Sequence, residues 1–136
     1  MNQDIEAALA AWLALTFTTT AITTGLANTP VSATEPTIIA VAGERENVVS
    51  TLNKTTVRII LSTPSHNGNT MDAHRALCLA LRNHIADKGA PRTALALQIA
   101  ANATGTALAG LVLTGEESEH LEGNWDTAFV CILATK

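Results

Sequence analysis

Aromatic and charged residues are scarce in this chain of 136 residues. Aromatic side chains make up 3% of it, with no tyrosine, and charged residues make up 15%, whereas a typical domain has about a quarter. Alanine supplies much of the 47% hydrophobic content, and alanine adds helix propensity but little buried area. We therefore expect a modest core and a neutral surface that suits association with other subunits. An ordinary alanine-rich domain would have the same composition.

Clustered basic residues are also lacking. Eight Lys and Arg stand against twelve Asp and Glu, which gives a net charge of −4, and no run of Lys or Arg occurs. Stable binding of a phosphate backbone needs clustered cations, and single-strand binding also needs aromatic side chains among them. The charge balance excludes a protein that holds DNA tightly, but it is compatible with one past which DNA slides.

Cysteine is nearly absent, and no targeting signal is recognisable. Cys78 and Cys131 each lie among apolar residues, which predicts two buried thiols in a reducing compartment rather than a disulfide. The apolar run 7–15 follows Asp4 and Glu6 instead of basic residues and is too short to cross a bilayer. We expect neither export nor a membrane partner.

Recognisable motifs for catalysis or metal binding are missing too. His66, His74, His84 and His120 lack the i, i+4 pairing of helical zinc ligands, and no serine elbow or phosphate-binding glycine loop occurs. His74 and Cys78 share a helical face, a spacing that could activate a thiolate. Nothing acidic or amide-bearing is spaced to orient His74, however, and leucines flank Cys78. We expect buried packing there, and no enzyme activity, metal or cofactor.

The hydrophobic periodicity predicts an α+β fold in a single domain, 1–136. Helices are expected at 2–15, 70–87 and 91–102, and strands at 37–43, 55–63, 108–114 and 125–134. Alternation at 94–99 leaves a strand possible there. Thr70 is expected to cap the helix that follows it, and Ala73 and Ala80 are expected on the apolar face of that helix. One face of each of two strands is expected to be apolar and inward: Val57, Ile59 and Leu61 in one, and Thr127, Phe129, Cys131 and Leu133 in the other. Paired strands around the helices favour a mostly antiparallel four-stranded sheet packed by helices, in the order α-β-β-α-(α)-β-β. The Thr-rich segment 16–35 is expected to be an extended connection with room for a short edge strand.

The polar segment 44–54 between the first two strands is the candidate assembly arm. Hairpin loops usually have about two to five residues, and longer loops are often functional. We expect this segment to be mobile in the free subunit and ordered against a neighbour or partner. Its candidate contacts mix charged and apolar side chains, as interfaces do: Glu44, Arg45, Glu46, Val48, Val49 and Leu52.

An acidic segment between Gly115 and Gly123 is the second candidate region. We expect a hairpin turn that faces solvent, a subunit interface or a channel, because catalytic carboxylate pairs usually come from separate elements. Trp125 follows it and is expected to bury its ring and fix the sheet edge that carries subunit contacts. The candidate channel or interface residues are Glu116, Glu117, Glu119 and Glu122.

The order of these elements carries a family resemblance over nearly the whole chain. It consists of an N-terminal helix, a Pro-containing coil, two strands around a polar arm, a helix, and a last strand after an acidic segment. The segments are DIEAALAAWLAL, EPTIIAVAG, KTTVRIILSTP, NTMDAHRALCLALRNHIAD and GNWDTAFVCILATK. With Pro36 and Trp125, this order resembles the tail terminator (tail-completion) proteins of long-tailed bacteriophages. The Thr-rich segment 16–29 and the Ala-rich segment 93–109 depart from the family pattern.

The resemblance implies a virion structural protein without catalytic activity. It implies a homohexameric ring that caps the tail tube, ends tube polymerisation and joins the tube to a neck or connector protein, with DNA only passing through the lumen. Such a ring would be assembled in the host cytoplasm and would stay at the tail–neck junction. Two alternatives remain: a head–tail connector or stopper ring and, from another class, a small cytosolic enzyme or ligand-binding domain.

Overall fold

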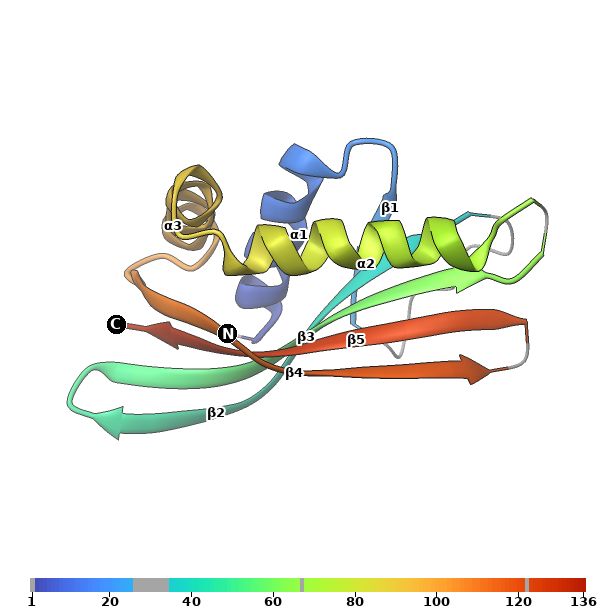
Figure 1. The fold of residues 1–136 in the computed structure, drawn as a ribbon. Helices are drawn as coiled ribbons and strands as arrows, with labels where there is room; N and C mark the ends of the chain where they lie inside the picture. Colours follow the sequence, from blue (N-terminus) through green and yellow to red (C-terminus); the bar gives the residue numbers. More distant parts are fainter. Residues whose placement is uncertain (1, 26–34, 67, 122) are drawn as a thin grey trace.

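The computed structural model describes residues 2–25, 35–66, 68–121 and 123–136. Over these residues, three helices lie on one side of a five-stranded, mostly antiparallel mixed sheet (Figure 1). The elements are α1 (Asn2–Thr16), β1 (Ala21–Thr24), β2 (Thr37–Val49), β3 (Leu52–Pro64), α2 (Met71–Ala86), α3 (Ala90–Asn102), β4 (Leu108–Leu121) and β5 (Asn124–Thr135). The α+β prediction is confirmed. The additional strand, β1, lies in the Thr-rich connection.

The strands are ordered β1-β2-β3-β5-β4, and only the β1–β2 pair is parallel. The last strand of the chain, β5, is therefore inserted between β3 and β4. Trp125 pairs with Thr63 on one side and with His120 on the other. The prediction that Trp125 fixes a sheet edge is wrong, because the spatial order of the strands differs from their order in the sequence.

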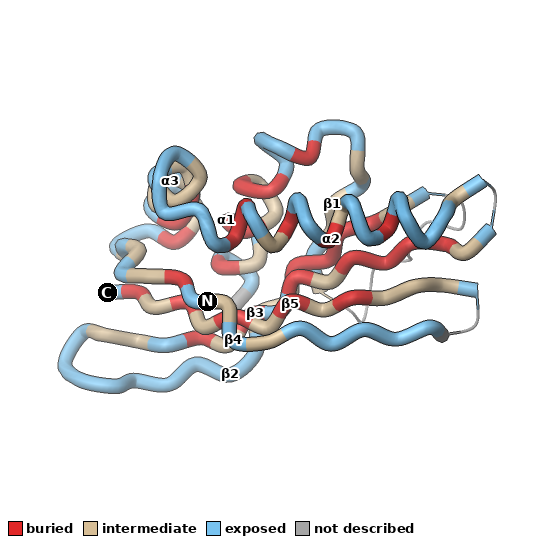
Figure 2. Tube along the Cα trace, viewed as in Figure 1, coloured by how far each residue is buried: buried red, intermediate tan, exposed pale blue. Residues whose placement is uncertain are grey.

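The core lies between the helices and one face of the central strands. Val57, Ile59 and Leu61 of β3 are buried there, and so are the predicted inward residues of β5: Thr127, Phe129, Cys131 and Leu133. Arg58 and Ile60 lie on the other face and are more exposed. Figure 2 shows buried segments gathered in the central strands and on the sides of the helices that face them. The predicted alternation is confirmed in both strands, since successive side chains of a strand point to opposite faces.

Trp12 connects the three helices. Its side chain is fully buried, its indole N–H donates a hydrogen bond to the carbonyl of Pro91 at 2.8 Å, and its ring stacks on His84 with centroids 4.5 Å apart. A buried tryptophan needs a hydrogen-bond acceptor for its N–H, and the start of α3 supplies it. In addition, Glu6 accepts a hydrogen bond from the backbone N–H of Ala42 at 2.9 Å, which attaches α1 to β2.

Helix α2 begins as predicted, with Thr70 at the N-cap, where its side chain accepts a hydrogen bond from Ala73 N–H at 3.1 Å. Its buried face differs from the prediction. Ala73 and Ala80 were expected on the apolar face but are exposed, whereas His74 is buried, as expected. The reason is that His74 finds hydroxyl partners on the sheet, which an apolar pattern cannot register.

Candidate functional site

The segment 44–54 is a β-hairpin rather than the loop predicted from its polarity. Strands β2 and β3 stay paired up to a tight turn at Ser50 and Thr51, and the hairpin extends away from the helices (Figure 1). The Asn47 side-chain amide donates hydrogen bonds to the Ser50 carbonyl at 3.1 Å and to Asn53 Oδ1 at 3.2 Å. Backbone pairing and this local network form the hairpin, so apolar alternation is not needed. We call residues 44–54 the arm.

All six predicted assembly contacts lie on the arm. Val48 and Val49 are 41% and 63% exposed near its tip, and Leu52 is half-buried. The charged residues among the six, which are Glu44, Arg45 and Glu46, are exposed. Exposed valines bordered by charges are typical of a contact surface with an apolar centre and a polar rim.

The acidic segment is also extended, and the predicted turn between Gly115 and Gly123 is wrong. Strand β4 continues through it to Leu121 and pairs with β5 over this length. Pairing with β5, the next strand along the chain, makes this polar segment a strand. Glu122 lies outside the described residues.

Strand geometry separates the remaining three glutamates instead of joining them in one site. Glu116 accepts two hydrogen bonds from the Arg82 guanidinium, including Nη2 to Oε2 at 2.9 Å. These bonds hold the pKa of Glu116 below its usual range and raise the pKa of Arg82. Glu117, the next residue in the strand, pairs with Arg58 at 3.3 Å. Glu119 has no ion-pair partner among the described residues.

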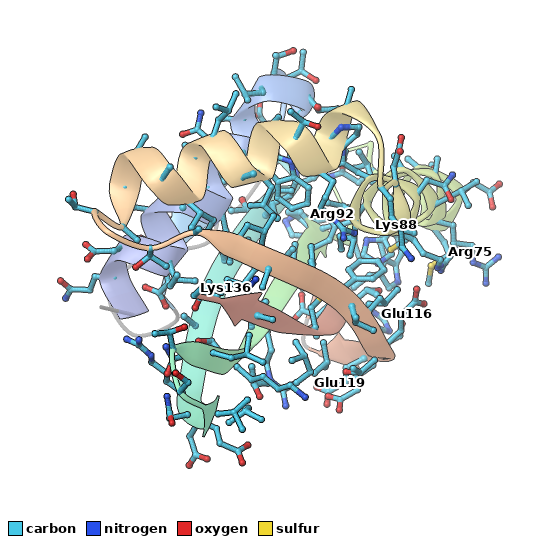
Figure 3. All side chains as sticks on the ribbon, turned by 90° about the vertical axis from the view of Figure 1, so that its left-hand side faces the viewer. Arg75, Lys88, Arg92, Glu116, Glu119 and Lys136 are labelled. Carbon is cyan, nitrogen blue, oxygen red and sulfur yellow. The ribbon has the colours of Figure 1, made fainter. Side chains whose placement is uncertain are left out.

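A hollow of about 570 Å³ lies between α2 and the neighbouring parts of β4 and β5. We call it the groove. The residues that line it include Met71, Arg75 and Leu79 from α2, Glu116 and Glu119 from β4, and Trp125 from β5. Figure 3 shows Arg75, Glu116 and Glu119 on the same side of the molecule. The groove was not predicted, because strand pairing brings together walls that are far apart in the sequence.

His74 lies at the base of the groove and is only 3% exposed. Its Nδ1 is 2.7 Å from Thr63 Oγ1, and its Nε2 is 2.9 Å from Thr127 Oγ1. Burial lowers the pKa of His74, although the charge of Asp126 opposes this shift. The imidazole is therefore neutral at pH 7, and its two hydroxyl partners fasten α2 to β3 and β5.

The predicted His–Cys pair is present, with Cys78 Sγ 3.5 Å from His74 Nε2. Burial raises the pKa of the Cys78 thiol, and it raises the pKa of Cys131 to about 12. Both cysteines are buried and free, as predicted. A protonated thiol beside a neutral imidazole that already contacts Thr127 does not form an activated nucleophile. The pair packs the core.

Among the described residues, no group of three or more His, Cys, Asp or Glu is placed to hold a metal ion. In the same part of the chain, no helix is both long and apolar enough to cross a membrane.

The sheet face opposite the helices carries a second apolar surface. Ile60, Val130 and Ile132 are half-buried there by their neighbours in the sheet, and Val112 on β4 is 61% exposed. None of the described helices covers this face (Figure 1). An uncovered apolar sheet surface is typical of an interaction site.

No protein-family model matches the chain, and no curated protein matches it either. The features of the structure that bear on function are the arm, the groove and the uncovered sheet face.

Two buried histidines predict a loss of stability in mild acid. Burial lowers the pKa of both His74 and His84 from the usual 6.5, so the unfolded chain binds more protons than the folded one below about pH 6.5. Stability is complete above that pH and falls as the pH drops through the folded-state pKa values. We expect the Tm to fall between pH 7.5 and pH 5, above the range in which most carboxylates titrate.

Thermal melts of the wild type and of a His84→Gln variant over this range test the pH prediction. The variant should start from a lower Tm, because it loses the stacking on Trp12, and its Tm should vary less with pH. A wild-type Tm that is constant from pH 7.5 to pH 5 would contradict the assignment of neutral buried histidines.

Proposed function

We propose that this protein is the subunit of a phage tail terminator. In this proposal it forms a homohexameric ring that caps the tail tube, ends tube polymerisation and joins the tube to a neck or connector protein. The ring acts at the tail–neck junction of the virion after assembly in the host cytoplasm. Its role is structural, without catalysis or a cofactor, and DNA only passes through its lumen.

The arm is the observation that carries the proposal. It extends beyond the helices, and its tip exposes Val48 and Val49, which pack on nothing in the subunit core. Exposed apolar side chains on a projecting hairpin contribute little to the subunit that bears them, but they gain buried area in an assembly. Such an arm therefore suits a subunit of an assembly better than a monomer.

Two further features support a ring through which DNA passes. The uncovered sheet face offers a second surface for neighbouring subunits or the tube. The net charge of −4 and the absence of Lys and Arg runs suit a lumen that lets DNA slide, because fixed cations would retain phosphates. Apart from the additional strand β1, the order of the elements is the one on which the family resemblance is based.

The assembly state of the purified protein is the first test. Light scattering at high protein concentration should give about six times the chain mass of 14.2 kDa, and electron microscopy should show closed rings on the ends of tail tubes. Monomers in solution together with bare tubes would refute the proposal. Rings that bind isolated heads but not tubes would instead indicate a connector or stopper.

A further inference from the structure

We propose that the groove receives the arm of a neighbouring copy of this chain. This inference rests on the proposed ring and names its subunit contact. The arm tip and the groove lie at opposite ends of the molecule (Figure 1), so the arm cannot fill the groove of its own subunit. A contact between two different surfaces of one chain is head-to-tail, and such contacts produce rings when the rotation closes.

The apolar parts of the two surfaces match in character. The arm exposes Val48 and Val49, at 41% and 63%. The groove exposes Met71 and Leu79 on its helix wall, at 37% and 52%, with the half-buried Trp125 between its walls. An exposed aromatic and aliphatic hollow is the kind of site that receives apolar anchors from a partner.

The two walls of the groove carry opposite charges. Arg75 and Arg82 line it from α2, and Glu116 lines it from β4. Figure 3 shows Arg75 and Glu116 on the same side of the molecule. Arg82 and Glu116 are bound to each other, which among the described residues leaves the groove's Arg75 without an ion-pair partner. Glu119 shares the face of β4 with Glu117 and points away from α2, so the groove offers one unpaired cation on its helix wall.

The arm carries a carboxylate that complements this cation. Glu46 on β2 pairs in register with Lys54 on β3, so both side chains lie on one face of the hairpin. Neither forms an ion pair among the described residues. An arm seated with β2 beside α2 brings Glu46 to Arg75. This complementarity identifies a second copy of the chain as the occupant.

Cysteine cross-linking tests the contact in the full chain. Val49→Cys and Leu79→Cys are made separately, each with Cys78→Ala so that no native thiol lies in the groove, and the two proteins are mixed before assembly and oxidised. A covalent dimer should form only in the mixture. The matched control replaces Leu79→Cys with Leu97→Cys, which is 66% exposed on α3, and should give no dimer.

A charge exchange that keeps Cys78 tests the same contact if the Cys78→Ala background folds poorly. Arg75→Glu and Glu46→Arg should each weaken assembly by about tenfold, and the double variant should recover most of the loss. Additive losses would overturn the pairing.

The outcomes separate this inference from the proposed function. Rings of normal mass without the Val49–Leu79 cross-link overturn the arm–groove contact and leave the ring standing. A dimer of Val49→Cys with itself also overturns the contact, because two arm tips then meet. A small molecule that occupies the groove in assembled rings also overturns the arm–groove contact. Chains that never assemble overturn both the contact and the proposed ring.

Discussion

Replacing Phe129 with alanine should lower the free energy of unfolding by about 3–5 kcal/mol. Phe129 is 0% exposed on the helix-facing side of β5, and it belongs to the same core as Trp12 and Ile59. Its strand is paired on both sides, so the backbone cannot move in to fill the space. With a total stability of about 5–15 kcal/mol for a domain, the variant should melt far below the wild type or fail to fold.

Two glutamate variants serve as controls for this result. Glu117→Gln removes only an ion pair between side chains that are 64% and 45% exposed, and Glu119→Gln removes no ion pair among the described residues. Exposed pairs contribute about 0–1 kcal/mol, so both variants should melt close to the wild type. Thermal melts of the three proteins decide the matter. A glutamate variant that melts like Phe129→Ala would mean that β4 contains a specific buried site.

Shortening the arm should abolish assembly while the subunit stays folded. Because Arg45 and Thr55 pair in register, residues 46–54 can be replaced by Asn-Gly, which favours a two-residue hairpin turn. The removed residues contribute no side chain to the buried core, and only Asn53 and Lys54 among them pair with β5. The Tm should therefore fall only slightly below that of the wild type, and light scattering should show monomers at every concentration.

A pair of point variants controls for the deletion. Val49→Asp places a charge on an arm side chain that is 63% exposed, and Leu97→Asp places one on a side chain of α3 that is 66% exposed. Only the first should prevent assembly, because burying an unpaired charge in an interface is costly. If the shortened protein forms rings as well as the wild type does, the arm is not a contact that assembly requires.

The helices and strands with one buried face could be predicted from the sequence, because their apolar residues recur at the spacing of a helix or a strand. Val57, Ile59 and Leu61 alternate with exposed neighbours, and Thr70 caps α2 as its position indicated. Phe129 was placed in the core by the same alternation. These features depend on local spacing and on one apolar face.

The polar elements were missed because backbone pairing, which leaves no apolar pattern in the sequence, determines them. The arm contains few apolar residues, yet it is a hairpin because β2 and β3 continue to pair. Glu116 and Glu117 looked like one acidic turn, but strand geometry sends them to different arginines. His74 was expected to pack, but its bonds to hydroxyls on β3 and β5 depend on the strand order. The groove depends on that order as well.

Tube capping is the most direct measurement of the proposed function. Tail tube protein is polymerised with and without the purified protein, and tube lengths and tube ends are recorded by electron microscopy. The tail-terminator proposal predicts a ring on one end of each tube and no further growth from that end. The Val49→Asp variant should leave tubes bare and growing. Tubes that grow equally with and without the wild-type protein, and that carry no ring at either end, would contradict it.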